Sequence, residues 1–478
     1  MLKFGTGGWR AEIGKDFHMS NIQLIGQALA DRINDLREND KPVVIGYDRR
    51  FLSDSAAKWL AVVLAGNGIK VWLMHRSVPT PLVMHTVMKK GLHYGLEVTA
   101  SHNPSNYNGI KIIVEEGRDA PVSVTENIEL RCSMVRRIND VDFDNAIACR
   151  LIDYIENPFN DFIDDIMAVL DLEAIRKRGP RILFDSMHGS SAYPFNVVFY
   201  SARCTVDQVN ANKDAYFGGK MPAPTETTLM SLADQVVAGG YDLGMGIDGD
   251  GDRLGVIDSD GRYISANDIL VLLYYYLHEY KGWKGPVVRN LATTHLLDRV
   301  AEGLGEKCYE VPVGFKHISS KIDEVDAVLG GESSGGLTVR GHIHGKDSIY
   351  ASALFVEMMC KTGKAPGEMI RELKDRYGDR VMVEYNAALT EGQKNTLLDM
   401  FEKGMEDEQA VAEKLPVFEK PWSRVNYIDG CKLYFDDDSF VICRPSGTEP
   451  LLRIFAEAPT REQAQGYIDA WKKQLSEI

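Results

Sequence analysis

One serine of this chain stands where it could carry a covalent phosphate. Apolar and polar residues alternate from Leu96 to Thr99, which predicts a short strand, and Pro104 prevents a regular ladder from continuing. Ser101 and His102 follow this strand, and strands of α/β proteins deliver reactive groups at their carboxyl ends. We therefore expect Ser101 to be an exposed serine at a strand end. Taken alone, the Ser-His pair is better explained by a turn in which the serine bonds its own backbone.

Three aspartates at alternate positions form the second chemical feature. Asp248, Asp250 and Asp252 follow an apolar run, and the glycines between them let the backbone curl so that the carboxylates can converge. Mg²⁺ and Ca²⁺ prefer oxygen ligands of this kind. A helix-loop-helix calcium site needs glycine and glutamate where Arg253 and Ser259 stand, and the apolar residues after the loop predict a strand. The spacing therefore favours a divalent metal over a calcium sensor or a solvated acidic turn.

A third feature follows the apolar run from Phe440 to Cys443. The segment RPSGTEP offers a guanidinium, two hydroxyls and a glycine, and these groups suit a phosphate. Arginine can bind two phosphate oxygens, hydroxyls donate, and glycine lets backbone amides approach. The residues concerned are Arg444, Ser446, Gly447 and Thr448. Taken alone, an ordinary Pro/Gly turn explains the segment equally well.

A fourth feature is the glycine-rich segment GGESSGG at 330–336. Its carboxylate, Glu332, and one of its hydroxyls, Ser334, could hydrogen-bond adjacent hydroxyls of a sugar. In isolation, a flexible polar loop would be the better explanation of this segment. Ligand binding becomes the stronger hypothesis because the serine, the aspartates and the phosphate-type segment occur in the same chain.

The elements between these segments predict α/β domains. We expect a strand from Val43 to Tyr47, a helix from Ser55 to Asn67 and a strand from Ile69 to Met74. This strand-helix-strand order implies parallel strands joined by right-handed crossovers. A strand from Arg181 to Asp185 continues the rhythm, which is consistent with several related domains. An acidic helix from Thr390 to Glu413 then precedes further strands.

The composition is that of an ordinary folded protein. The 478 residues correspond to about three domains, so a division into four is not strained. Hydrophobic residues make up 44% and charged residues 26%, which argues against disorder. The net charge of −15 disfavours nucleic acid and anionic membranes as partners. An anionic substrate must then be attracted by local cations, for which the candidates are Arg10, Lys111, Arg253, Lys316 and Arg444.

No targeting or membrane-spanning segment is visible. The first residues lack an apolar core behind a basic end, and no stretch approaches the roughly 20 apolar residues of a membrane span. The seven cysteines are scattered and include no CxxC pair, which fits reduced thiols. We expect a cytoplasmic monomer or homodimer.

Taken in order, TASHNPSNYNGIK, DGDGDR, GGESSGG and RPSGTEP resemble the motifs of the α-D-phosphohexomutase superfamily, the phosphoglucomutases and phosphomannomutases. FGTGGWR at 4–10 resembles the opening of that family, so the resemblance spans the chain. It implies an α/β fold of four domains around a central cleft: three related α/β domains with mixed sheets and a smaller α+β C-terminal domain. The expected domains are 1–145 for the phosphoserine, 146–258 for the metal, 259–367 for the sugar and 368–478 for the phosphate.

The resemblance also implies a reaction. Phosphorylated Ser101 would give its phosphate to a hexose phosphate, and the bisphosphorylated intermediate would turn around and return its other phosphate. Mg²⁺ would be held by Asp248, Asp250 and Asp252 with one oxygen at Ser101, and Arg253 would hold the loop or the phosphate. A mutase of this kind should need glucose 1,6-bisphosphate, or an equivalent hexose bisphosphate, as activator.

Three residues are candidates for moving or stabilising charge. Lys111 and Arg10 stand at the family's positions for acid-base roles. Lysine could act so only with a depressed pKa, which neighbouring cations could produce, and a pure phosphate anchor explains Lys111 equally well. For His102 we favour a role in fixing the loop over that of a general base, because adjacent residues rarely face one target.

The remaining positions concern the substrate. The resemblance assigns sugar contacts to Gly331, Glu332, Ser334 and Lys316, and the non-transferring phosphate to the segment at 444–448. Many bacterial members carry histidine where Gly336 stands. This departure and the VGFKH segment favour glucose phosphate over mannose phosphate, with glucosamine phosphate as a further alternative. A Mg²⁺-dependent sugar phosphatase and a non-enzymatic phosphosugar-binding protein are the competing classes.

Overall fold

The computed structural model describes residues 2–5, 7–445 and 451–476. The chain divides into two compact units, Met1–Tyr276 with Leu329–Gly367, and Leu277–Val328 with Glu368–Ile478. The predicted phosphate-binding residues Ser446, Gly447 and Thr448 lie outside the described residues. None of the described helices is long and apolar enough to cross a membrane.

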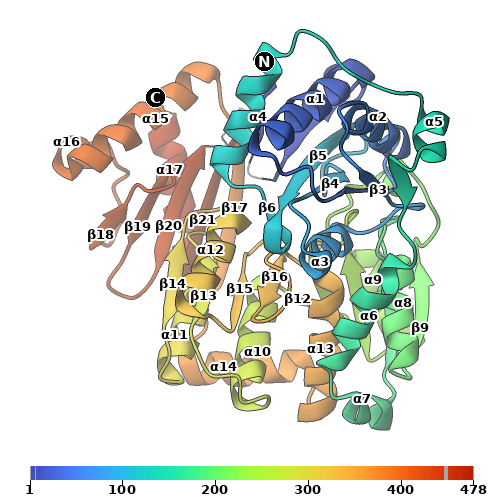
Figure 1. Cartoon of the computed structure of the whole chain (residues 1–478). Helices are drawn as coiled ribbons and strands as arrows, with labels where there is room; N and C mark the ends of the chain where they lie inside the picture. Colours follow the sequence, from blue (N-terminus) through green and yellow to red (C-terminus); the bar gives the residue numbers. More distant parts are fainter. Residues whose placement is uncertain (1, 6, 446–450, 477–478) are drawn as a thin grey trace. The chain divides into compact units, whose positions relative to one another are not determined.

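The first unit begins with a mixed sheet in the order β1-β5-β4-β2-β3-β7, with β6 paired to β5. Figure 1 labels β3, β4, β5 and β6 of this sheet. β2 is parallel to β3 and β4, whereas β5 is antiparallel to β1, β4 and β6. The strands are β1 (Trp9–Glu12), β2 (Val43–Tyr47), β3 (Val71–Leu73), β4 (Tyr94–Val98), β5 (Tyr107–Val114), β6 (Arg118–Asp119) and β7 (Ile152–Tyr154). The parallel crossover predicted for residues 43–74 is therefore confirmed. β5 returns antiparallel because the segment after β4 is shorter than the dozen or so residues that a crossover needs.

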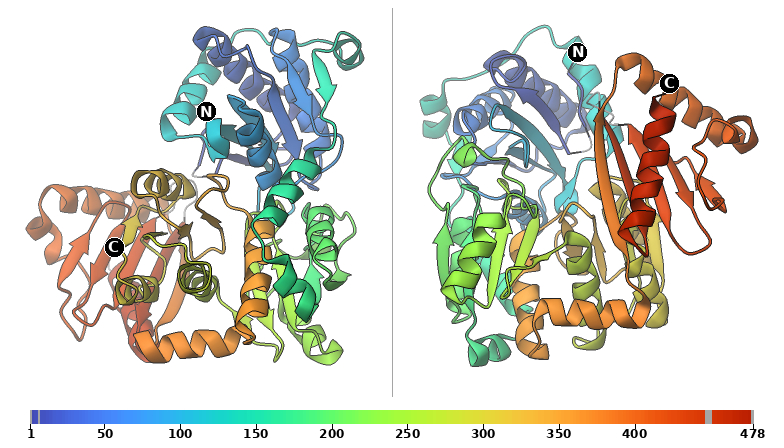
Figure 2. Two further views of the ribbon diagram at one scale, coloured as in Figure 1. Left: turned by 60° about the horizontal axis from the view of Figure 1, so that its bottom comes forward. Right: turned by 180° about the vertical axis from the view of Figure 1, so that it is seen from behind.

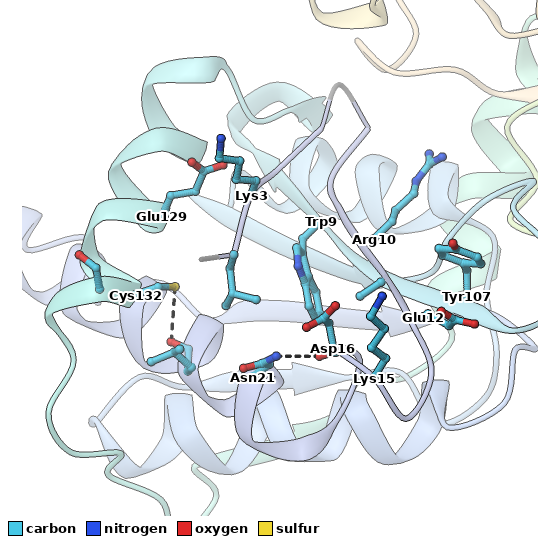
Figure 3. A pocket seen from close by; sticks show the side chains of 14 residues that line it. Lys3, Trp9, Arg10, Glu12, Lys15, Asp16, Asn21, Tyr107, Glu129 and Cys132 are labelled. Carbon is cyan, nitrogen blue, oxygen red and sulfur yellow. Dashed lines mark hydrogen bonds between the residues drawn. The ribbon is translucent and has the colours of Figure 1, made fainter. Parts of the chain in front are cut away.

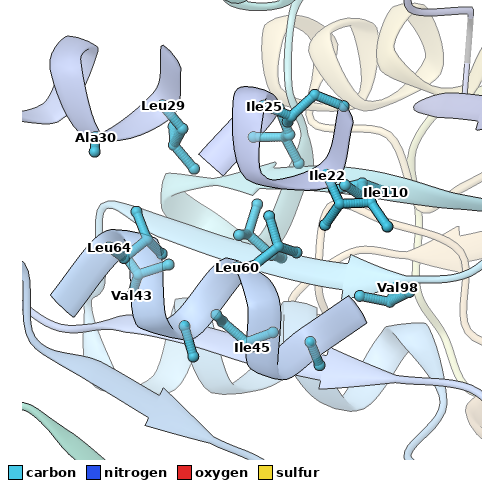
Figure 4. Packing of buried hydrophobic residues seen from close by; sticks show 14 of the residues in the cluster. Ile22, Ile25, Leu29, Ala30, Val43, Ile45, Leu60, Leu64, Val98 and Ile110 are labelled. Carbon is cyan, nitrogen blue, oxygen red and sulfur yellow. The ribbon is translucent and has the colours of Figure 1, made fainter. Parts of the chain in front are cut away.

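Helices cover both faces of this sheet and build its core. They are α1 (Met19–Leu36), α2 (Ser53–Gly66), α3 (Thr80–Lys90), α4 (Val122–Met134) and α5 (Phe143–Ala148). Figure 4 shows Ile25 of α1 and Leu60 of α2 packed with Ile45 of β2 and Ile110 of β5, all fully buried. Burial of each such side chain stabilises the fold by roughly 1.5–3 kcal/mol. This core fixes the position of the strand ends on which the polar segments lie.

A second sheet in the same unit has the order β12-β11-β10-β8-β9. β8 is parallel to β9 and β10, and β10 forms an antiparallel hairpin with β11. The strands are β8 (Arg181–Asp185), β9 (Thr205–Val209), β10 (Leu243–Ile247), β11 (Leu254–Asp258) and β12 (Tyr263–Ile264). The helices of this region are α6 (Pro158–Ala168), α7 (Leu172–Arg178), α8 (Ala192–Ser201) and α9 (Met230–Gly239). The aspartate segment is the turn of the β10–β11 hairpin.

The first unit is completed by residues 329–367. β15 (Leu329–Gly331) and β16 (Leu337–Val339) form an antiparallel hairpin whose turn is the predicted sugar loop. α13 (Ser348–Thr362) follows, and the side chain of Asp347 caps its first turn by accepting from two backbone amides. α10 (Ala266–Glu279) carries the chain from the first unit into the second.

The second unit combines a parallel strand pair with an antiparallel sheet. β13 (Val287–Asn290) and β14 (Cys308–Val311) are parallel, and α11 (Leu296–Gly303), α12 (Phe315–Val325) and α14 (Pro366–Tyr377) accompany them. The sheet has the order β17-β21-β20-β19-β18, with every pair antiparallel. Its strands are β17 (Val381–Ala388), β18 (Arg424–Asn426), β19 (Cys431–Tyr434), β20 (Phe440–Pro445) and β21 (Leu451–Ala458). α17 (Arg461–Leu475) lies against one face of this sheet (Figure 2).

The acidic helix predicted from Thr390 to Glu413 is broken. α15 (Glu391–Glu406) ends before Asp407, and α16 (Glu408–Ala412) begins after it. Asp407 has extended backbone (φ −147°, ψ 102°), and its side chain accepts from the amide of Gln409. An aspartate in this position starts a new helix instead of continuing the old one. The prediction of one continuous helix was therefore wrong.

Candidate active site

Ser101 lies in the turn that leaves β4, and it is buried. Ser101 is only 1% exposed, and its backbone is left-handed (φ 51°). The Ser101 amide donates to Oγ1 of Thr99 (2.8 Å), and its hydroxyl donates to Oδ2 of Asp248 (3.2 Å). The expectation of an exposed serine was wrong because the β10–β11 turn covers it. Gly249 of that turn lies against the Ser101 carbonyl, and a Cβ there would be 3.1 Å from the oxygen.

The three aspartates converge as their spacing predicts. Asp248, Asp250 and Asp252 are all buried, and one carboxylate oxygen from each lies within 4.8 Å of the others. Gly251 turns the chain between them with positive φ (83°). Oδ1 of Asp248 accepts from the amides of Asp252 (2.9 Å) and Arg253 (3.0 Å), which fixes the loop.

Burial and neighbouring charge separate the pKa values of these carboxyls. Burial and the charges of Asp250 and Asp252 raise the pKa of Asp248 well above its usual range. Burial acts in the same direction on Asp252, but Lys111, Lys346 and Arg253 outweigh it and hold that pKa well below its usual range. The repulsion among the three carboxylates is therefore least compensated at Asp248, which accepts the hydrogen bond from the Ser101 hydroxyl.

The donor set fits a divalent cation. Oδ2 of Asp250 accepts from Thr80 (2.7 Å) and Lys111 (2.7 Å), and Oδ2 of Asp252 accepts from Lys111 (2.8 Å). Among the described residues, no hydrogen-bond donor reaches Oδ1 of either aspartate, although both atoms are buried. Buried carboxylate oxygens without a donor are costly unless a cation binds them. The lysine therefore orients both carboxylates while leaving one oxygen of each for a metal.

Lys111 is an anchor of the aspartate loop. It lies on β5 opposite Glu97 of β4, is buried, and forms ion pairs with Asp250 and Asp252. Burial alone would lower the pKa of Lys111, but the two carboxylates outweigh burial and raise it above its usual value. A raised pKa is the opposite of what proton transfer by a lysine requires, and the contacts of Lys111 are with the aspartate loop.

Arg10, His102 and Arg253 line the same turn. Nη1 of Arg10 donates to Oδ1 of Asn103 (2.7 Å), and Nδ1 of His102 lies 3.4 Å from Oγ of Ser101. Burial, together with the charges of Arg253 and Arg10, lowers the pKa of His102 well below its usual value and keeps the imidazole neutral. Nε of Arg253 lies 3.9 Å from Oδ1 of Asp252. These contacts place all three predicted residues around the Ser101 loop.

The sugar loop meets the aspartate loop within the first unit. The amide of Leu254, the first residue of β11, donates to the carbonyl of Gly335 (3.1 Å). Glu332 is buried, and its amide donates to the carbonyl of Gly336 (3.0 Å). Gly331 leaves room for Leu270, whose Cδ2 would be 2.1 Å from a Cβ at that position. The structure therefore places Gly331 at the end of β15 and Glu332 and Ser334 on the turn that follows, next to the aspartate loop.

Sequence reasoning missed two residues at this centre. Nζ of Lys346 lies 3.0 Å from Oδ2 of Asp252, and its stem crosses Gly336, where a Cβ would be 2.1 Å from Cδ of the lysine. Thr80, at the start of α3, contributes its hydroxyl to Asp250 and its amide to the Asp250 carbonyl (2.8 Å). No contact with the aspartates was predicted for either residue, and only the folded chain brings them there.

Of the remaining predicted residues, the structure describes Lys316 and Arg444, which lie in the second unit. Nε of Arg444 on β20 donates to Oδ1 of Asp429 (2.8 Å), and Oδ2 of Asp429 accepts from the amide of Val313 (2.9 Å). Lys316 lies in the first turn of α12, three residues after Val313. Asp429 thus joins the arginine of the phosphate segment to the VGFKH segment, which sequence reasoning had treated separately.

A cavity of about 770 Å³ in the first unit lies apart from the aspartates. Trp9, Lys15, Asn21 and Tyr107 line it, and Arg10 stands at one side with its guanidinium pointing away from Lys3 and Glu129 (Figure 3). Of the residues predicted for the site, Arg10 alone is among those that line this cavity. The convergence of polar groups at Ser101, not the size of a cavity, identifies the candidate active site.

Comparison with known proteins gives a match along the chain. Four models described as phosphoglucomutase/phosphomannomutase domains match it: α/β/α domain I at 1–135, domain II at 160–261, domain III at 265–377 and the C-terminal domain at 384–474. A phosphoglucomutase/phosphomannomutase of Thermococcus kodakarensis is 29% identical over 99% of this chain and 98% of its own.

Two further proteins broaden the comparison. A phosphoglucosamine/phosphogalactosamine mutase of Sulfurisphaera tokodaii is 26% identical over 98% of both chains. The crystal structure of a protein assigned as a phosphomannomutase from Thermus thermophilus superposes with a TM-score of 0.83 and 26% identity, covering 99% of both chains. The sugars named for these relatives differ, although each comparison covers 98% or more of both chains.

Proposed function

Because the chain belongs to the phosphoglucomutase/phosphomannomutase family, we propose that it interconverts glucose 1-phosphate and glucose 6-phosphate through a phosphate carried by Ser101. The observation that carries this proposal is the position of the Ser101 hydroxyl, 3.2 Å from Asp248 in a cluster of three buried carboxylates. A hydroxyl so placed can accept and return a phosphoryl group whose charge a bound cation compensates.

Asp248, Asp250 and Asp252 would hold Mg²⁺ together with an oxygen at Ser101. When bound, Mg²⁺ would neutralise negative charge on the transferring group. Lys111 and Lys346 hold Oδ2 atoms of the aspartates and so present the opposite oxygens to the centre. They also add two positive charges within a chain whose net charge is −15, which would otherwise repel a sugar phosphate.

Some of the remaining predicted residues would contact the end of the sugar where phosphate is transferred, and the others would bind the rest of the substrate. Arg10, His102 and Arg253 surround the Ser101 loop, where they would contact the transferring phosphate. Glu332 and Ser334 would bind sugar hydroxyls. The family resemblance assigns Lys316 to the sugar as well and Arg444 to the non-transferring phosphate. A hexose bisphosphate such as glucose 1,6-bisphosphate would return phosphate to a serine that has lost it.

Glucose phosphate is favoured over its alternatives by the sugar loop. Gly336 stands where many bacterial family members carry histidine, and the stem of Lys346 fills the space that a side chain at 336 would need. Mannose phosphate and glucosamine phosphate are the alternatives, since relatives of this chain are named for each kind of activity.

The substrate proposal is tested with the purified chain, Mg²⁺ and catalytic glucose 1,6-bisphosphate. We expect kcat/KM for glucose 1-phosphate to exceed that for mannose 1-phosphate and glucosamine 1-phosphate by about tenfold or more. Released inorganic phosphate should be a small fraction of turnover. A higher kcat/KM for either other sugar would overturn the glucose assignment, and stoichiometric phosphate release would show a phosphatase.

The role of Gly336 gives a separate prediction. In Gly336→Ala the new Cβ must displace the stem of Lys346, so the lysine loses its contact with Asp252. We expect kcat/KM for glucose 1-phosphate to fall about tenfold, from one weakened charge-assisted contact. Gly466→Ala on α17 is the matched control, because nothing lies within 4 Å of a Cβ there. Equal activity of the two variants would contradict the proposed role of the lysine.

A further inference from the structure

Arg50 is buried beneath the Ser101 loop, and the reaction proposed above does not use it. It stands in the turn between β2 and α2 and is only 1% exposed. We infer that Arg50 is a positioning residue that sets the backbone of the Ser101 loop for phosphoryl transfer. This inference rests on the proposed function of Ser101 as the phosphate carrier.

The guanidinium of Arg50 binds four main-chain carbonyls of one loop. Nη2 donates to the carbonyls of Ser101 (2.5 Å) and Asn103 (2.6 Å). Nη1 donates to the carbonyls of Pro104 (2.8 Å) and Tyr107 (3.0 Å). The planar fork of arginine can serve several fixed acceptors at once, which the flexible ammonium of a lysine does less well. One side chain therefore fixes the loop from the reacting serine to the start of β5.

The Nε side of the Arg50 guanidinium is connected to Ser101 through Asp48 and Thr99. Nε of Arg50 lies 3.3 Å from Oδ2 of Asp48, which accepts from the hydroxyl of Thr99 (2.7 Å). Oγ1 of Thr99 in turn accepts from the amide of Ser101 (2.8 Å). The amide and the carbonyl of Ser101 are thus both tied to one buried ion pair.

Such a restraint is needed because the backbone of Ser101 is unfavourable. A left-handed φ of 51° at a residue other than glycine persists only where the surrounding contacts enforce it. In this conformation the Ser101 hydroxyl reaches Asp248. Releasing the loop would let the serine relax and move its oxygen away from the aspartates.

Arg50 is not placed to bind the phosphate itself. Its two terminal nitrogens already donate to carbonyls, and its Cζ lies 4.8 Å from the centre of the Phe217 ring, which covers one face of the guanidinium. The arginine therefore acts through the loop. Its loss should slow phosphoryl transfer and leave substrate affinity largely unchanged.

Arg50→Lys is the direct test, with the purified chain, Mg²⁺ and glucose 1,6-bisphosphate as phosphate donor. We expect kcat to fall about 100-fold with KM changed less than about threefold, since a small misplacement of the reacting atom costs this much. The rate at which Ser101 gains phosphate, followed by intact mass, should fall in parallel. Arg49→Lys is the matched control, because the neighbouring arginine also donates to a main-chain carbonyl, that of Ala211 (2.8 Å), outside the serine loop.

Thr99→Val provides a second test that keeps the shape of the side chain and the buried ion pair. It removes the link between Asp48 and the Ser101 amide. We therefore expect kcat and the phosphorylation rate to fall about tenfold, less than in Arg50→Lys. If the folded fraction of both variants has the kcat and phosphorylation rate of the wild type, and only the melting temperature is lowered, the role of Arg50 is merely structural. That result would overturn the inference. An equal loss in Arg49→Lys would also overturn it. Failure of the wild-type chain to take phosphate on Ser101 would instead overturn the proposed function on which it rests.

Discussion

Ser101→Ala is expected to reduce mutase activity by about 10⁴-fold or more, because no other hydroxyl can replace the carrier of the phosphate. The Ser101 hydroxyl contacts Asp248 at 3.2 Å and Nδ1 of His102 at 3.4 Å, so its removal leaves the loop contacts of Arg50 and Thr99 in place. The melting temperature should therefore change little. Initial rates with glucose 1-phosphate, Mg²⁺ and bisphosphate measure the effect.

A serine of the same loop supplies the control for this variant. Ser105→Ala changes a residue that lies two positions before Tyr107 and outside the contacts of the aspartates. It should retain nearly full activity. A Ser101→Ala variant that kept a tenth or more of the wild-type rate would exclude Ser101 as the obligatory carrier.

Asp250→Asn is expected to remove most of the response to Mg²⁺ and to lower kcat by about 10³-fold. The substitution takes away one of three buried carboxylates and replaces an anionic ligand by a neutral one. Thermal unfolding with and without Mg²⁺ provides a readout besides activity, since a ligand that binds the folded state raises the melting temperature. The wild-type chain should show this shift and the variant should lose it.

Asp234→Asn is the matched control for the aspartate variant. Asp234 is an exposed carboxylate on α9 of the same unit, so its loss changes the net charge equally without touching the cluster. Both the Mg²⁺ shift and the activity should stay at wild-type level. A wild-type Mg²⁺ shift in Asp250→Asn would place the metal elsewhere.

Local patterns in the sequence were sufficient for much of the fold. The strands predicted at Val43–Tyr47 and Arg181–Asp185 have those bounds in the structure, because each is an apolar run that becomes fully or largely buried. The convergence of the three aspartates could also be predicted, because their alternate spacing already requires one tight turn. These features depend on neighbours within a few residues, and the pattern of side chains carries that information.

Features that depend on distant contacts could not be read in this way. Ser101 was expected to be exposed, but it is covered by a turn that is 147 residues away in sequence. No site role was predicted for Lys346 or Arg50, because their contacts are with a carboxylate and with carbonyls that the fold places beside them. The break at Asp407 had a local signal, an aspartate able to cap a new helix, that the periodicity of the acidic residues concealed.

The measurement that tests the central claim most directly is the fate of the phosphate on Ser101. The chain is labelled with radioactive glucose 1,6-bisphosphate and Mg²⁺, freed of small molecules and mixed with unlabelled glucose 1-phosphate. We predict that the label is on the Ser101 peptide and that it passes to hexose bisphosphate at least as fast as kcat. Label that is absent from Ser101, or that leaves it only as inorganic phosphate, would contradict the account.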